Sequence, residues 1–213
     1  MTFNKRELIR ESKWARVYKL ESQEGYFHES KFLFDDLSVS LSTIRKDWLT
    51  FPLEEKIEFA RAFSFKRELR GEDEAILDFL MESGPQEVWT TIAPRLPSHR
   101  DSARVTAFLL DRIETDGEPR ANYYQAIELL HAAEAVPLLR RRYAEYRSQL
   151  SSGLPDRDAL TSWTDYLSCC KALLSLTKDS TFLAVLKEGP ATVPSRLQPY
   201  AALLLREVEK PNG

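Results

Sequence analysis

The chain has 213 residues, of which 43% are hydrophobic and 30% charged, a composition that excludes an intrinsically disordered protein. Lys and Arg number 30 against 33 Asp and Glu, so the net charge of −3 lacks the basic excess of a general nucleic-acid binder. The two cysteines, Cys169 and Cys170, are adjacent, which excludes a disulfide framework and favours a reducing compartment.

The sequence predicts a cytoplasmic protein without membrane contact. Residues 1–10 are polar and charged and lack the apolar segment of a signal peptide. The longest uninterrupted apolar run, 200–205, is far too short to span a membrane.

Residues 1–40 are predicted to form an N-terminal cap on a helical domain that covers residues 41–213, with one structural domain overall. Residues 14–20 alternate loosely between polar and apolar, and an aromatic-rich run, 26–34, follows Gly25. A short hairpin fits this pattern. An irregular helical cap fits it equally well, and the sequence leaves both interpretations open.

From residue 41 onward, apolar residues recur every three or four positions, which predicts a succession of helices. Most Pro and Gly residues fall between the periodic segments, where they end helices. A loop is predicted at 189–194, and Pro137 is placed in the first turn of its helix. The predicted helices cover 41–51, 53–69, 72–83, 86–93, 101–114, 123–130, 136–150, 160–174, 180–187 and 195–209.

Four Leu-rich segments resemble one another weakly and begin at residues 75, 105, 135 and 181. Residues 132–139, Ala-Ala-Glu-Ala-Val-Pro-Leu-Leu, resemble the junction between the two helices of a HEAT-type (armadillo-like) repeat. The resemblance covers residues 53–209 in outline and residues 120–150 at the level of the motif. It implies an all-α fold in which antiparallel helix pairs stack as a short superhelix, and the alternative is a closed multi-helix bundle.

No sequence motif specifies a reaction, a metal or a cofactor. The seven Gly never cluster into a phosphate-binding loop, and no Gly-x-Ser-x-Gly or paired Cys-x-x-Cys motif is present. Glu128 and His131 have a spacing that places two metal ligands on one helical face, but the second such pair that a di-iron site needs is missing. No cofactor is therefore expected, and whether the protein is an enzyme stays open, with a non-catalytic role favoured.

The densest positive cluster is the candidate binding site. Arginine and aromatic side chains together can hold phosphates and stack on bases. In architecture this combination resembles the DNA glycosylases built from HEAT-like repeats, which also need a catalytic Asp that no motif places here. The alternative is a solvated helix face whose tyrosines belong to the core. The candidate residues are Arg140, Arg141, Arg142, Arg147, Tyr123 and Tyr124.

The expected function is a protein–protein interaction module that binds a partner protein on the concave face of the helical repeat. The alternative is a nucleic-acid-binding or DNA-repair protein that uses Arg140 to Arg142. A third hypothesis is a ligand-binding helical bundle with an apolar pocket between its helices.

Overall fold

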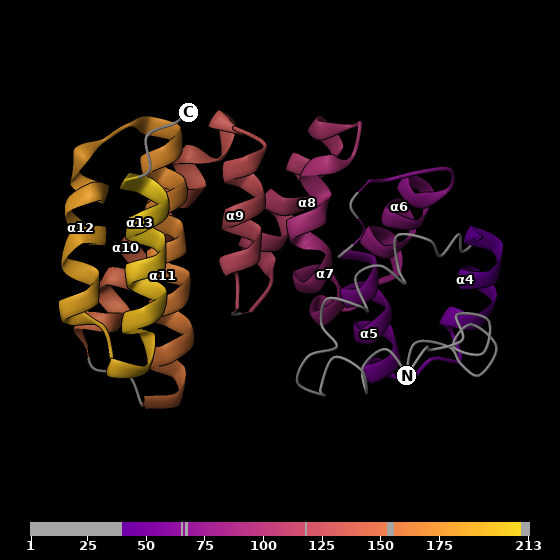
Figure 1. Cartoon of the computed structure of the whole chain (residues 1–213), viewed down its shortest axis with the longest axis horizontal. Coiled ribbons are helices and arrows are strands. Elements are labelled where there is room, and N and C mark those ends of the chain that lie inside the picture. Colours follow the sequence, from indigo (N-terminus) through magenta and orange to yellow (C-terminus); the bar gives the residue numbers. More distant parts are fainter. Residues whose placement is uncertain (1–39, 65, 67, 118, 153–155, 210–213) are drawn as a thin grey trace, which may run out of the picture. The chain divides into compact units, whose positions relative to one another are not determined.

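The computed structural model describes residues 40–209 except 65, 67, 118 and 153–155, and all regular elements there are helical (Figure 1). Ten α-helices and three short 3-10 segments lie within these residues. The prediction of an all-α fold is confirmed. Nearly all of the predicted N-terminal cap, including its hairpin alternative, lies outside the described residues.

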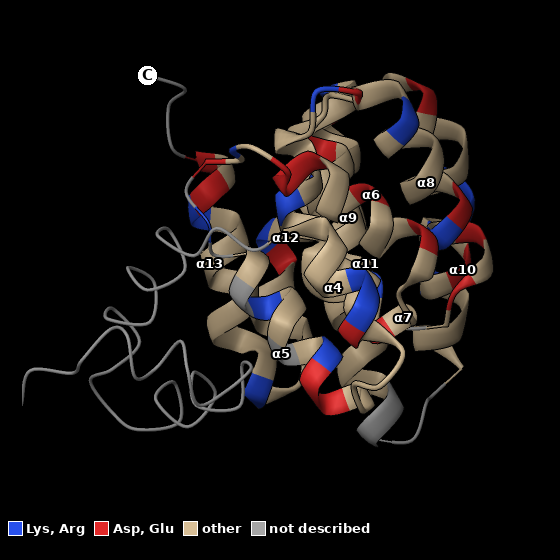
Figure 2. Cartoon of the chain, turned by 90° about the vertical axis from the view of Figure 1, so that its right-hand side faces the viewer, with Lys and Arg blue, Asp and Glu red and all other residues tan. Residues whose placement is uncertain are grey.

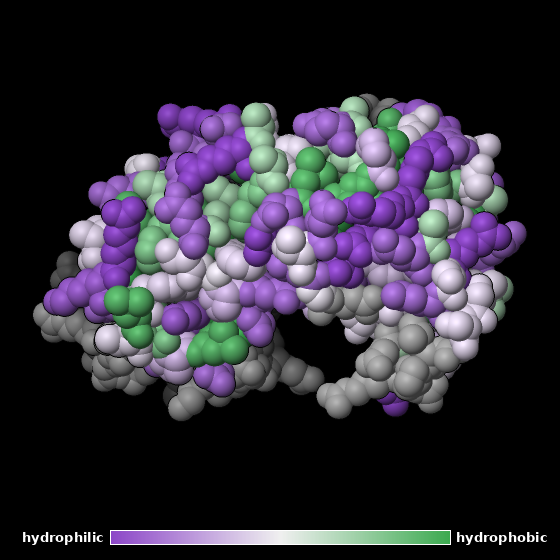
Figure 3. Space-filling view, turned by 180° about the vertical axis from the view of Figure 1, so that it is seen from behind, coloured by the Kyte–Doolittle hydropathy of each residue, from purple (hydrophilic) through white to green (hydrophobic). Residues whose placement is uncertain are grey.

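The chain divides into two compact units, one ending at Asp101 and one beginning at Ser102. The predicted single structural domain and its boundary at residue 40 stay predictions. Acidic and basic residues are interspersed along the helices (Figure 2). On the face seen from behind, hydrophilic residues cover much of the surface and hydrophobic residues form smaller patches (Figure 3).

In the first unit, the described residues pack four helices around an aromatic core. The ring centroid of Trp48 lies 5.7 Å from that of Phe79 and 6.2 Å from that of Phe59, both edge to face. The Trp48 indole N–H also donates to the Ser83 carbonyl at 3.2 Å, so this buried side chain has its polar atom satisfied. The elements are α4 (Leu41–Trp48), α5 (Leu53–Ser64), α6 (Asp73–Ser83), α7 (Gln86–Ile92) and a 3-10 segment (Ala93–Ser98).

The second unit contains the longest helix, α11, which packs against four others. Pro137 lies in the first turn of α10, as the sequence predicts, where its missing N–H removes no helical hydrogen bond. His131, with a φ of 52°, follows the end of α9 in the left-handed conformation that commonly closes helices. The helices are α8 (Ser102–Thr115), α9 (Ala121–Leu129), α10 (Val136–Ser151), α11 (Asp156–Thr177), α12 (Ser180–Thr192) and α13 (Gln198–Glu209), with 3-10 segments at Ala133–Ala135 and Ser195–Leu197.

In the second unit, α9 and α11 are neighbours that run in the same direction. Asp165 of α11 accepts hydrogen bonds from the backbone at Arg120 and Ala121, where α9 begins. Lys171, further along α11, pairs with Glu128 near the end of α9. Contacts that advance together along both helices require a parallel pair.

Two further pairs are also parallel. Ser168 and Lys171 of α11 contact Tyr200 and Glu207 of α13 in that order. On the other side, Arg140 of α10 pairs with Asp179, and Tyr143 packs edge-on to Phe182 of α12.

Consecutive helices α10 and α11 are instead antiparallel. The Cys169 thiol donates to the Leu139 carbonyl, whereas Tyr146, further along α10, reaches back to Asp165. The second unit therefore has two layers. In one, α11 lies between α9 and α13, and in the other, α10 is joined to α12 by Arg140 and Asp179 and to α8 by Arg141 and Glu114. This arrangement is compatible with a helical repeat, because corresponding helices of successive repeats lie side by side and parallel.

The predicted loop at 189–194 is wrong, because α12 continues to Thr192 with Pro190 inside it. Gly189 is buried, and a Cβ atom added to it would lie 3.4 Å from Leu167 and 3.6 Å from Ala201. The missing side chain lets α12 approach α11 and α13 closely. Packing on two neighbouring helices thus outweighs the local tendency of Gly-Pro to end a helix.

A buried ion pair stabilises the first unit. The Lys66 ammonium lies 2.6 Å from Oδ1 of Asp73, and Oδ2 of Asp73 accepts a hydrogen bond from the Arg70 N–H at 2.8 Å. Both charged residues are buried, so the loss of one partner leaves an uncompensated charge in a poorly solvated site.

We expect Asp73→Ala to lower the free energy of unfolding by about 3 kcal/mol or more, because the Lys66 ammonium loses its carboxylate. Denaturant unfolding of the full chain measures this effect. The double variant Lys66→Met/Asp73→Leu should lose less stability than Asp73→Ala alone, since it buries no unpaired charge. Equal losses in both variants would contradict the interpretation.

Candidate functional site

The four arginines predicted to bind a partner lie on α10, and acids compensate the charges of three of them. Arg140 pairs with Asp179 at 3.5 Å and lies over the ring of Phe182. Arg141 pairs with Glu114 of α8 at 2.8 Å. These contacts hold α10 to both of its neighbours in the layer.

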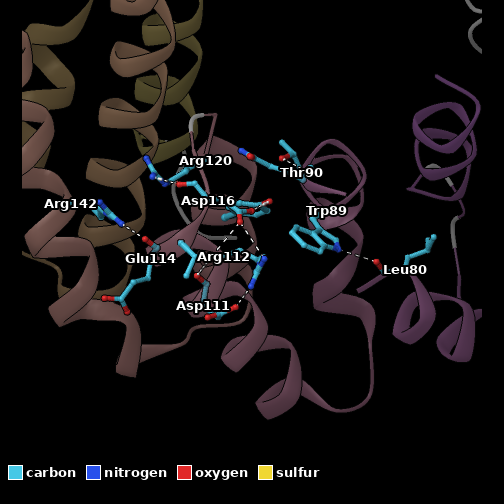
Figure 4. A network of polar contacts seen from close by, with 12 residues as sticks. Leu80, Trp89, Thr90, Asp111, Arg112, Glu114, Asp116, Arg120 and Arg142 are labelled. Carbon is cyan, nitrogen blue, oxygen red and sulfur yellow. Dashed lines mark hydrogen bonds and ion pairs between the residues drawn. The ribbon is translucent and has the colours of Figure 1, made fainter. Parts of the chain in front are cut away.

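Arg142 is the least exposed of these arginines, and each of its two terminal guanidinium nitrogens has a partner. It lies 2.6 Å from Glu145 and donates to the backbone carbonyl of Glu114 at 2.7 Å (Figure 4). Arg147 is exposed on the same helix. Because acids surround Arg140 to Arg142, the positive potential that a phosphate backbone would meet is reduced.

Tyr123 and Tyr124 are fully buried, so the structure places them in the core, the alternative that the sequence left open. The Tyr123 hydroxyl donates to Asp116 at 2.8 Å. The Tyr124 hydroxyl lies 2.9 Å from that of Tyr146. Neither tyrosine offers a surface to a partner, because both rings are enclosed by neighbouring helices. The partner-binding role of the four arginines stays a prediction.

A buried carboxylate, Asp165, organises the start of α9. Its oxygens accept hydrogen bonds from the backbone N–H groups of Arg120 and Ala121 at 2.8 Å and lie 3.4 Å from the Tyr146 hydroxyl. The Arg120 guanidinium also donates to Tyr146 at 3.2 Å and to the Asp116 carbonyl (Figure 4). Burial alone would lower the pKa of Arg120, but its interactions with Tyr146, Tyr124 and Asp165 outweigh burial and raise that pKa.

Asp165 is the one acid of the second unit that is wholly enclosed among the described residues, but its geometry is that of a helix cap. Its exposed fraction is 0%, and both of its oxygens are engaged by donors at the helix start. A catalytic carboxylate must reach a substrate. Asp165 is closed to solvent, which weighs against the glycosylase alternative.

The thiols and His131 show no arrangement for catalysis or metal binding. Cys169 and Cys170 are free and buried, and burial raises the pKa of both thiols, which disfavours the reactive thiolate. In the described part of the chain, no group of three or more His, Cys, Asp or Glu residues is placed to hold a metal ion. Glu128 pairs with Lys171.

A hollow of about 200 Å³ opens between α9, α11 and α13, within the second unit. We call it the groove. It is smaller than the usual range for small-molecule sites, which begins at about 300 Å³. Its lining mixes polar, charged and aliphatic side chains: Ala121, Asn122, Gln125, Glu128, Ser168, Lys171, Tyr200, Leu203, Leu204 and Glu207.

Lys171 lies at the centre of the charges in the groove. Its ammonium is 3.0 Å from Glu128 of α9 and 2.9 Å from Glu207 of α13. Burial alone would lower the pKa of Lys171, but hydrogen bonds to Glu207 and Glu128 outweigh burial and raise that pKa. The lysine therefore stays protonated near neutral pH, unlike a nucleophilic lysine, whose pKa is lowered.

Two exposed leucines lie on helices that border the groove. Leu203 of α13 lines it with 51% of its surface exposed, and Leu129 at the end of α9 is 53% exposed. An aliphatic side chain that is exposed at the edge of a hollow can be removed from water by a partner that occupies the hollow. The sequence analysis missed the groove, because its charged residues come from three helices that only the fold brings together.

No family model, no curated protein and no solved structure matches this chain. Among the described residues, no helix is both long enough and apolar enough to cross a membrane.

We expect Asp165→Ala to lower the free energy of unfolding by about 3 kcal/mol, because two backbone N–H groups and the Tyr146 hydroxyl lose a buried acceptor. Thermal or denaturant unfolding measures the loss. Asp179→Ala is the control, since Asp179 also accepts a backbone N–H at a helix start but is partly exposed. A loss no greater than that of the control would show that burial adds nothing.

Alkaline pH should destabilise the protein through Tyr124. Burial, then interactions with Cys169 and Tyr146, raise the pKa of Tyr124 above its ordinary value of 10.0. Because the folded-state pKa is the higher one, the stabilisation is complete below pH 10 and is lost as the pH rises above it.

The variant Tyr124→Phe removes this titrating group. Its unfolding free energy should be lower by about 1 kcal/mol near neutral pH, because the contact with the Tyr146 hydroxyl is lost. Above about pH 10, its stability should fall less steeply than that of the wild type. Parallel slopes for the two proteins in unfolding titrations would contradict the assignment.

Proposed function

We propose that this chain is a non-catalytic protein–protein interaction module with a HEAT-like helical repeat, which binds a partner protein in the groove between α9, α11 and α13. The observation that carries the proposal is the groove itself: a small hollow with a mixed lining and Leu203 at its edge. Partner proteins are anchored by a few side chains that fill such hollows. A hollow of about 200 Å³ suits one or two side chains better than a cofactor.

The HEAT-like part of the proposal is supported by the layers of the second unit. Neighbouring helices α9 and α11 are parallel, as are α10 and α12, while α10 and α11 are antiparallel. Stacked helix pairs produce this pattern. In a closed up-and-down bundle, by contrast, neighbouring helices are antiparallel.

The non-catalytic part is supported by the state of the ionisable groups. Lys171 has a raised pKa and two carboxylate partners, so it lacks the lowered pKa of a catalytic lysine. Asp165 is enclosed and serves as a helix cap. A cytoplasmic location belongs to the same proposal, since Cys169 and Cys170 are free thiols.

Nucleic-acid binding is the weaker candidate. The arginines that would carry it are paired with Asp179, Glu114 and Glu145. A duplex would have to displace these acids before it gained the counterion release that drives such binding.

The test is affinity capture from the source cells with the tagged full chain, with protein and nucleic acid both analysed in the eluate. We expect a partner protein whose recovery falls about tenfold with Leu203→Gln, because a polar side chain then replaces an aliphatic anchor at the groove while the charge stays the same. Recovery should persist with Leu49→Gln, which makes the same change at an exposed leucine of the first unit.

A second comparison distinguishes the two candidate surfaces. In the triple variant Arg140→Ser/Arg141→Ser/Arg142→Ser, capture of the partner should be unchanged. A partner lost with this variant and kept with Leu203→Gln would move the site to α10. Nucleic acid that co-elutes, is released by salt and disappears with the triple variant would support the nucleic-acid candidate instead.

A further inference from the structure

The charged side chains that line the groove leave a net negative charge. Its lining contains two carboxylates, Glu128 and Glu207, and one ammonium, Lys171, so one negative charge remains in excess. The single lysine is already shared between both acids, at 3.0 and 2.9 Å. A ligand that brings a second positive charge would restore the balance, whereas a ligand carboxylate would increase the excess.

The exposure of the three charged side chains indicates from which side a cation can approach. The Lys171 side chain is 15% exposed and that of Glu128 is 19% exposed, so both lie deep in the groove. The Glu207 side chain is 41% exposed and forms the accessible end of the cluster. A carboxylate has two oxygens and about four lone-pair sites, so Glu207 has the capacity to accept from a second cation while it holds Lys171.

The apolar part of the lining adds a second requirement. Leu203 and Leu204 line the groove on α13, and Leu203 is 51% exposed. Burying an exposed leucine against an aliphatic side chain is favourable, because apolar surface of both side chains is removed from water. The surface therefore offers an aliphatic contact next to an acidic one, on the same helix as Glu207.

We propose that the groove binds a Lys or Arg side chain of the partner protein, and that an aliphatic residue next to it in the partner covers Leu203. This inference rests on the proposed function, because it names the chemistry of the partner that the groove binds. The cation contacts the Glu207 carboxylate at the open end of the cluster. The size of the groove matches this occupant, since about 200 Å³ holds a single long side chain but not a larger ligand.

The test uses a display library of random short peptides selected against the full chain. Lys or Arg next to Leu, Ile, Val or Met should be enriched among the selected peptides. Two or three of them are then synthesised, and their affinities are measured by fluorescence anisotropy. Binding should weaken about tenfold with Glu207→Gln, because the charge-assisted hydrogen bond is lost.

Glu209→Gln is the matched control. It makes the same change of residue and net charge on the same helix, but Glu209 is exposed and does not line the groove. Its affinity for the peptides should equal that of the wild type, which excludes a general attraction between basic peptides and an acidic protein. Circular dichroism of both variants checks that they fold alike.

The outcomes separate this inference from the proposed function. Selected peptides that lose binding with Leu203→Gln but contain acidic in place of basic residues, or bind Glu207→Gln as tightly as the wild type, overturn the cation chemistry. The proposed groove would then still stand. Peptides that bind Leu203→Gln as tightly as the wild type, or a selection that enriches no peptide, overturn both the inference and the proposed site.

Discussion

The second unit depends on one buried carboxylate. Asp165 projects from the middle of α11, the helix that packs against four others, and is fully enclosed. Burying a carboxylate without partners would be strongly unfavourable. Here the backbone N–H groups at the start of α9 are its donors, and these are the groups that a helix start leaves without intrahelical partners. The carboxylate and the backbone N–H groups would each be costly to bury alone, but here they form hydrogen bonds with one another. Tyr146 connects them to α10.

The groove lies further along the same side of α11. Residues three apart on a helix are neighbours on its surface, so Asp165, Ser168 and Lys171 form a polar line. At one end of this line, Asp165 is closed off beneath the start of α9. At the other end, Lys171 is partly exposed between Glu128 and Glu207. The interaction that fixes α9 against α11 thus also sets the spacing of the helices that border the candidate site.

The sequence predicted the helices well, because a helix that buries one face has apolar residues every three or four positions. This pattern is visible within a short segment of the sequence. In α8, for example, Val105, Leu109 and Ile113 follow one another at helical spacing and are fully buried, while Phe108 of the same predicted stripe is half-buried. Where local and tertiary effects compete, the sequence misleads, as at Gly189 and Pro190, where packing on two neighbours continues the helix.

The candidate site was harder to predict than the helices. The positions of Tyr123 and Tyr124 in the sequence do not show whether they face the surface or the core. Only the fold shows that both are enclosed. The acids that compensate the arginines of α10, Glu114 and Asp179, are far from them in sequence. The groove combines residues of three helices, so no pattern within a single segment of the sequence predicts it.

The two layers explain why the arginines of α10 and the groove have different roles. Opposite charges on neighbouring helices hold the layer of α8, α10 and α12 together. Arg140 and Arg141 use their charges in this way, toward α12 and toward α8. In the other layer, Lys171 faces acids from both sides, and one negative charge is left over beside an exposed leucine. Three clustered arginines of α10 are therefore balanced by acids, while the groove keeps an excess negative charge that a cationic partner can use.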